Sequence, residues 1–164
     1  MSLPRSKYFT PAEMRCRDEV RTPYPEQWAL RLAVLFEALD TIREEWGGPL
    51  TIVSGYRTPE HNSEINGAHQ SQHVQGRAVD LRPLKRNLSV GDINRLGSIV
   101  EMLLAQAKLP AVGGVGVYPL HRDPRSNLLF PGWVHVDCRP RPADGHIARW
   151  QGEKFGDEKP SEVA

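Results

Sequence analysis

The stretch SQHVQGRAVDLRP, residues 71–83, carries a histidine, a glycine and an aspartate at spacings that favour one local structure. Residues 77–82 alternate with a period of two, which is typical of a half-buried strand and places Asp80 on the face opposite to the apolar side chains. Gly76 can let the chain reverse without a Cβ clash. We therefore expect the strand to aim Asp80 back towards His73 in the preceding loop.

A second polar pair lies far downstream, in the segment WVHVDC at residues 133–138. The period of a strand there places Trp133, His135 and Asp137 on one face and the two valines on the other. We expect this strand to belong to the same sheet as the first. His135 would then come from another strand towards Asp80, and the shared polar face would form a cleft.

Helices and further strands are expected around these two segments. Apolar residues recur mainly at three- and four-residue steps in residues 25–46, the pattern of an amphipathic helix, and the glycines at 47–48 end it. Helices are expected at residues 10–16, 25–46, from 58 onward and at 88–107, and strands at 50–54, 77–82, 113–117 and 133–138. This order favours an α+β fold with a small, largely antiparallel sheet and flanking helices.

Length and composition predict a single domain. The 164 residues suit one core, which we expect to occupy about residues 9–150. Residues 119–131 are interpreted as a mostly polar loop. Proline, glycine and charge dominate from residue 139, and residues 154–164 are expected to form a flexible tail.

Charge and hydropathy exclude several classes of partner. The formal net charge is +1 with both signs interspersed, so the basic surface that nucleic acid requires is missing. The longest apolar stretch, residues 29–39, contains Arg31 and Glu37 and is too short to span a membrane. The N-terminus has no apolar segment typical of a secretory leader, so we expect export by the general route only if a leader was removed.

The sequence also gives little support to two simpler classes of site. Cys16 and Cys138 are too few for a disulfide framework and are interpreted as small buried residues. The glycines of residues 113–116 lack the third glycine and the following helix of a dinucleotide site.

The two histidines and one aspartate of the polar segments form a candidate metal-binding set. Zinc in a hydrolytic site takes three protein ligands, usually histidine and carboxylate, and leaves a fourth position for water. His73, Asp80 and His135 supply such a set. One histidine near one aspartate also arises by chance. Two such pairs strengthen the metal hypothesis, because burying unpaired imidazoles and carboxylates costs about 2–7 kcal/mol or more for each group.

Four motifs together resemble a known family. They are SGYRTPEHN at residues 54–62, Ser-x-His-x-x-Gly-x-Ala-x-Asp at 71–80, GGVG at 113–116 and WVHVD at 133–137. These residues resemble the zinc D-Ala-D-Ala carboxypeptidase family, especially its branch ending in Val-His-Val-Asp. The resemblance covers roughly residues 9–139.

The resemblance implies the α+β fold shared with lysostaphin-type peptidases and the hedgehog signalling domain, Zn²⁺ as cofactor, and peptidoglycan peptides as substrate. By motif, His73, Asp80 and His135 match the three zinc ligands. Arg57 matches an arginine that binds the substrate carboxylate or stabilises the transition state, and a structural arginine is the alternative. Ser71 either bonds substrate or fixes the His73 loop.

The general base is the imperfect part of the match. Related branches place an acidic residue three positions before the last zinc histidine, or a histidine two positions before it, whereas this chain has Gly132 and Trp133 there. Asp137 is the best remaining carboxylate. It is predicted to act either as the base or as the partner that orients a ligand histidine.

Two functions of different class follow. The first is a zinc metallopeptidase, carboxypeptidase or endopeptidase, which uses metal-activated water to cut amide bonds of peptidoglycan stem peptides or cross-links. It would act at the bacterial cell wall, as a phage lysis or tail enzyme or as an exported bacterial enzyme, and we expect a monomer. The alternative is a zinc-containing cell-wall binding module without turnover, which the unfilled base positions permit.

Overall fold

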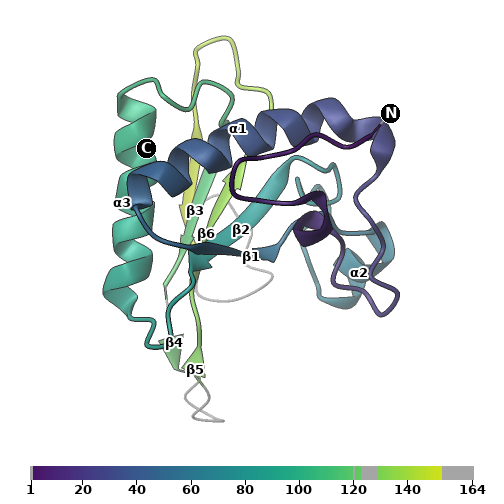
Figure 1. Cartoon of the computed structure of the whole chain (residues 1–164), viewed down its shortest axis with the longest axis horizontal. Helices are drawn as coiled ribbons and strands as arrows, with labels where there is room; N and C mark the ends of the chain where they lie inside the picture. The colour runs from purple at the N-terminus through teal and green to yellow at the C-terminus, as the bar shows by residue number, and fades with distance from the viewer. Residues whose placement is uncertain (1, 120, 123–128, 153–164) are drawn as a thin grey trace.

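The computed structural model describes residues 2–119, 121–122 and 129–152. Figure 1 shows a sheet with long helices beside it and an N-terminal segment that runs along one of these helices. The elements are η1 (Pro11–Met14), η2 (Glu26–Trp28), α1 (Ala29–Trp46), β1 (Leu50–Ser54), α2 (Pro59–Glu64), β2 (Ala78–Pro83), α3 (Val90–Ala105), β3 (Gly114–Tyr118), β4 (His121–Arg122), β5 (Leu129–Phe130), β6 (Trp133–Asp137) and β7 (Ala148–Gln151).

The main sheet has five strands in the order β1-β2-β6-β3-β7. β2 and β6 are central neighbours and pair antiparallel, with Asp80 directly opposite His135. On the other side of β6, β3 pairs antiparallel and places Gly116 opposite His135 and Gly114 opposite Asp137. The register therefore brings the polar residues of two strands together, with glycines beside them.

The prediction of a largely antiparallel sheet is wrong, because the sheet is mixed. β7 pairs parallel to β3, with Gly116 opposite Trp150. Sequence patterns did not indicate β7, since it spans only four residues within a segment rich in proline, glycine and charge, and only Trp150 is buried in it. A parallel partner is also joined through a long connection, so no local turn signal marks it.

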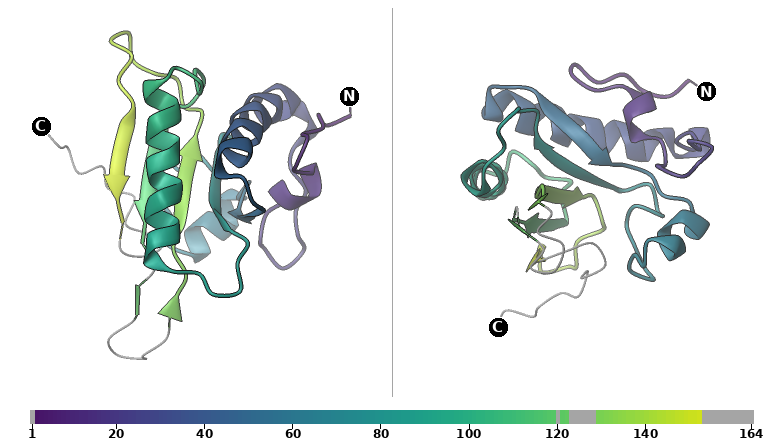
Figure 2. Two further views of the ribbon diagram at one scale, coloured as in Figure 1. Left: turned by 60° about the vertical axis from the view of Figure 1, so that its left-hand side comes forward. Right: turned by 90° about the horizontal axis from the view of Figure 1, so that it is seen from below.

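The long helices α1 and α3 cover one face of the sheet. α3 lies against it in Figure 2, and α1 packs beside α3. The main core lies between these helices and the apolar side of the strands, which contributes Val79, Leu81, Val115, Val134 and Val136. The opposite face carries the polar residues and a second, aromatic cluster of Tyr118, Trp133 and Trp150. As predicted, Asp80 and His135 lie on the face away from the core.

Most expected elements are present with small shifts. The helix expected at residues 10–16 is the short 3₁₀ turn η1, which a capping box between Thr10 and Glu13 begins. β2 is buried on both faces rather than half-buried, because the loops that carry the site cover its polar side; Val79 and Asp80 are 0% and 1% exposed.

Two expectations fall wholly or partly outside the described residues. Within residues 119–131, interpreted as a loop, β4 and β5 pair antiparallel, and the segment between them is not described. The tail expected at residues 154–164 lies outside the described residues. No helix in the described part of the chain is long and apolar enough to cross a membrane.

Candidate metal centre

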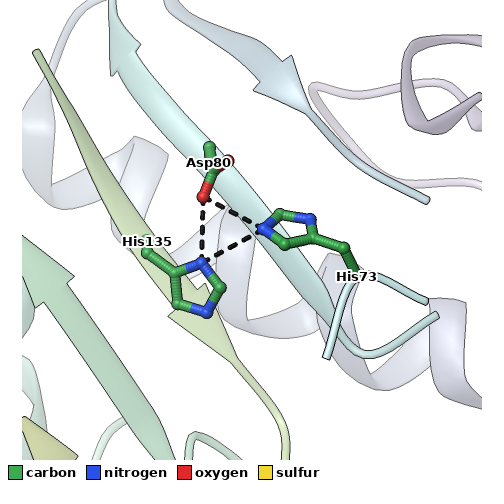
Figure 3. Close-up of side chains that lie close together, drawn as sticks. All are labelled: His73, Asp80 and His135. Carbon is green, nitrogen blue, oxygen red and sulfur yellow. Dashed lines mark hydrogen bonds and ion pairs between the residues drawn. The ribbon is translucent and has the colours of Figure 1, made fainter. Parts of the chain in front are cut away.

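Three buried side chains converge at one point on the polar face of the sheet. His73 Nε2 lies 3.2 Å from both Asp80 Oδ1 and His135 Nδ1, and His135 Nδ1 lies 2.9 Å from Asp80 Oδ1. Figure 3 shows the three donor atoms facing one another, two from neighbouring strands and one from a loop. Their side chains are 3% exposed or less. The sequence prediction that these residues come together agrees with this geometry.

His73 is held on several sides by the loop that carries it. Its Nδ1 donates to the carbonyl of Gly55 at 2.7 Å, which leaves Nε2 as the nitrogen with a free lone pair. The Arg57 backbone N–H donates to the His73 carbonyl at 3.3 Å. Ser71 Oγ accepts from the His73 backbone N–H at 3.3 Å. The Gly55–Arg57 turn thus fixes both the ring and the backbone of this residue.

Gly76 ends the same loop in the left-handed region, with φ +63°. Its N–H donates to the His73 carbonyl at 3.1 Å, and its own carbonyl accepts from Tyr24 Oη at 2.6 Å. A Cβ at this position would lie 2.5 Å from Trp28. An aromatic cluster of Tyr24, Trp28 and Tyr56 therefore packs directly against the turn that positions His73.

Asp80 uses its two oxygens differently. Oδ1 faces the two histidines, whereas Oδ2 accepts from Arg57 Nη2 at 3.0 Å. Burial would raise the pKa of the Asp80 carboxyl, but the charges and hydrogen bonds of His73 and His135 outweigh it and hold the pKa well below its ordinary value. Asp80 is therefore an anion with one oxygen committed to Arg57.

The two histidines differ in basicity. Burial and the charge of Arg57 lower the pKa of His73. Burial also acts to lower the pKa of His135, but hydrogen bonds with Asp137 and Asp80 raise it to about 9. Since a metal binds the unprotonated imidazole, a cation among these donors must displace the proton of His135.

The donor set fits zinc. Two imidazole nitrogens and one carboxylate oxygen are ligands that zinc accepts, and three protein ligands leave a fourth position for water. Tetrahedral bonds of about 2.0–2.1 Å place donor atoms about 3.3 Å apart. The observed separations of 2.9, 3.2 and 3.2 Å need only a slight expansion to reach that arrangement. Within the described residues, this is the group of histidine, cysteine and acidic side chains that could hold an ion.

Comparison with known families agrees with the geometry. Residues 7–108, more than half of the chain, match the family model described as Peptidase M15. The chain belongs to the M15 peptidase family. The resemblance to the zinc D-Ala-D-Ala carboxypeptidase-type family is therefore confirmed. M15 peptidases are typically zinc-dependent. A search of curated proteins found no match. The family match includes His73 and Asp80, whereas His135 lies beyond its end.

The other predicted site residues of this M15 peptidase are buried, and each bonds to a candidate ligand or to the loop that carries one. Arg57 is 4% exposed, and its Nε donates to Ser54 Oγ at 3.0 Å while its Nη2 bonds Asp80. Ser71 is 1% exposed and bonds the His73 loop. Asp137 Oδ2 lies 3.1 Å from His135 Nε2, on the ring edge opposite to the shared donor point. Arg57 and Asp137 thus each contact a candidate ligand, Asp80 and His135 respectively, and not the point where the three donor atoms meet.

Sequence reasoning missed two residues that contact this network. Arg139 Nε donates to Asp137 Oδ1 at 2.8 Å. The ring of Trp150 lies 5.1 Å from that of His135. Arg139 follows Asp137 by two positions, and an arginine beside a buried carboxylate could have been noticed. Trp150 had no such signal, because its position depends on the unexpected pairing of β7 with β3.

Proposed function

We propose that this M15 peptidase is a zinc metallopeptidase that hydrolyses amide bonds in peptidoglycan stem peptides or cross-links, as a carboxypeptidase or an endopeptidase. The observation that carries the proposal is the convergence of His73 Nε2, Asp80 Oδ1 and His135 Nδ1 in a buried site. Zinc held there supplies Lewis acidity and lowers the pKa of a water ligand to about 7.

The surrounding residues support this chemistry by fixing the donors. Arg57 holds Asp80 Oδ2, so that Asp80 offers a single oxygen to a metal. The Gly55 carbonyl accepts a hydrogen bond from His73 Nδ1–H, which selects the tautomer with Nε2 free. In our proposal Ser71 fixes the His73 loop, one of the two roles that its sequence position predicts.

The roles of Arg57 and Asp137 in the chemical step stay predictions. For Arg57 the contacts support a positioning role at Asp80, and a further role at the developing oxyanion is tested by comparing kcat and KM in an Arg57→Lys variant. For Asp137 the bond to His135 Nε2 supports the orienting role over the role of general base.

The test is hydrolysis by protein in defined metal states. Metal-depleted protein, protein reloaded with zinc and a His73→Ala variant are incubated with purified peptidoglycan and with a pentapeptide ending in D-Ala-D-Ala. We expect new amines only with zinc-loaded wild type, and mass spectrometry separates release of one D-Ala from cleavage of cross-links. His69→Ala is the matched control, because His69 is exposed and outside the donor set. Equal product from metal-depleted and zinc-loaded protein would refute the proposal.

A zinc-containing binding module without turnover is the second candidate. It is favoured by Trp133, which occupies one of the family's base positions and is 5% exposed, stacked on Tyr118 with ring centroids 4.5 Å apart. One zinc per chain, retention on peptidoglycan and no product from either substrate would establish the module instead of the enzyme.

We also propose that the protein acts as a monomer at the bacterial cell wall. Light scattering coupled to size exclusion tests the oligomeric state, and a dimer mass would contradict it. Fractionation of the producing cells or phage particles tests the site of action, which a protein confined to the cytoplasm would contradict.

A further inference from the structure

The ligand histidine of β6 has two ring nitrogens with different neighbours. His135 Nδ1 faces Asp80, and Nε2 faces Asp137 Oδ2 at 3.1 Å. An ionised carboxylate can only accept a hydrogen bond, so each ring nitrogen donates where it faces Asp80 or Asp137. A metal bound at Nδ1 would take the place of the proton that faces Asp80, and the contact with Asp137 would keep the other proton on Nε2.

Asp137 is itself fixed on both oxygens by Arg139. The backbone N–H of Arg139 donates to Oδ1 at 3.0 Å, its Nε donates to Oδ1 at 2.8 Å, and its Nη2 donates to Oδ2 at 2.5 Å. The Asp137 side chain is fully buried, whereas Arg139 is 32% exposed. The space for this pair exists because residue 114 is glycine, since a Cβ there would lie 2.4 Å from Asp137 Oδ2.

Arg139 also contacts Trp150, whose indole ring lies beside the same imidazole. Its guanidinium lies 5.3 Å from the ring centre of Trp150, a cation–π contact. Trp150 lies 5.1 Å from the His135 ring and is held by a hydrogen bond from Nε1 to Tyr118 Oη at 2.8 Å. A Cβ at Gly116 would lie 2.4 Å from Trp150 Nε1, so the glycine lets the indole lie against β3.

We propose that Arg139 is a positioning residue of the metal centre, which acts mainly through Asp137 to hold the His135 ring in the orientation that presents Nδ1. The inference rests on the proposed metal binding by His73, Asp80 and His135. It assigns a function to a residue outside the donor set and beyond the family match, and it requires that the segment after the end of β6 contribute to metal affinity.

The experiment measures zinc affinity by competition with a chromophoric chelator, for wild type, Arg139→Ala, Arg139→Lys and Asp137→Ala. Loss of a residue that orients a ligand histidine typically weakens metal binding about 10- to 100-fold, which we expect for Arg139→Ala. Arg139→Lys keeps the charge but cannot hold both carboxylate oxygens, so we expect only partial recovery. Arg141→Ala is the matched control: Arg141 donates to the Val112 and Leu109 carbonyls and has no described contact with Asp137.

A double-mutant cycle tests the route of the effect. If Arg139 acts through Asp137, the Arg139→Ala change should cost less than threefold in zinc affinity once Asp137 is already alanine. ¹⁵N chemical shifts of the His135 ring in zinc-loaded protein give a second readout, and should report a proton on Nε2 in wild type and in Arg139→Lys, even if the alanine variant does not fold.

The outcomes separate the two proposals. Zinc binding by Arg139→Ala within twofold of wild type, a loss no larger than that of Arg141→Ala, or an undiminished loss in the Asp137→Ala background would overturn the positioning role alone. Wild-type protein that binds no zinc would overturn the proposed function, and the positioning role with it.

Discussion

Replacing Gly76 with alanine tests how the loop turn positions the metal site. Gly76 has φ +63° and directly follows the loop that carries His73. The added Cβ would lie 2.5 Å from Trp28 Cε3 and 2.9 Å from Tyr24 Oη. Tyr24 is 2% exposed and in edge contact with Trp28, so the ring and the hydroxyl have little room to withdraw.

The loss of folding stability in Gly76→Ala has two parts, and control variants allow them to be measured separately. A left-handed backbone costs an alanine about 1–2 kcal/mol. Crowding a packed aromatic cluster adds about 1–3 kcal/mol. Gly47 and Gly145 both have φ +76°, and a Cβ added at either position would have no neighbouring atom within 4 Å. Gly47→Ala and Gly145→Ala should therefore show the backbone part alone, and Gly76→Ala should lose about 1–3 kcal/mol more than either of them.

The assay is guanidinium denaturation of metal-free protein for the three variants, followed by zinc competition. We expect Gly76→Ala to weaken zinc binding as well, because the Gly76 N–H donates to the His73 carbonyl and the turn moves with it. The two control variants should bind zinc as wild type does. A Gly76→Ala variant no less stable than the controls would show that the aromatic cluster yields freely, and the steric reasoning would be refuted.

Three further predictions concern the turn at Gly76, the binding of zinc and the start of α3. Tyr24→Phe removes the donor to the Gly76 carbonyl and should destabilise the fold by about 1–3 kcal/mol in denaturation, and no change would show that water replaces the hydroxyl. Zinc at 100 times its Kd should raise stability by about 2.7 kcal/mol, seen as a higher Tm that a chelator reverses, and an unchanged Tm would contradict metal binding to the folded state. At the start of α3, hydrogen bonds from Lys85 and Ser89 lower the pKa of Asp92 from 3.8 to about 2. Its stabilising contribution is therefore complete above 3.8 and lost as the pH falls through 2, so Asp92→Asn should lower the Tm at pH 7 but not near pH 2.

The sequence was sufficient to predict the central strands and their polar face. In β2 and β6 a period of two separates valines from charged residues, and only one orientation buries the valines. The same pattern predicted that Asp80 and His135 lie close together, because both are on the same side of adjacent strands.

Other parts of the site had no local signal. Trp150 reaches His135 only because β7 pairs parallel to β3, which contacts between distant segments determine. The sequence left Arg57 between a substrate-binding role and a structural role, and its contacts with Asp80 and Ser54 depend on how the turn after β1 folds over the sheet. Spacing in the sequence shows which side of a strand a residue occupies, but not which atom of a long side chain finds which partner.

The three candidate ligands differ in what fixes them, and this difference predicts where the site is vulnerable. Asp80 and His135 are held by the register of β2 and β6, and a slip by one residue would turn Val134 and Val136 onto the polar face and the charged residues into the core. That cost keeps the register, so the backbone positions of these two donors are as stable as the sheet itself. His73 has no strand to hold it and depends on the Gly55 carbonyl and the turn at Gly76. Substitutions in the aromatic cluster behind that turn should therefore weaken metal binding at a smaller cost in global stability than substitutions between the central strands.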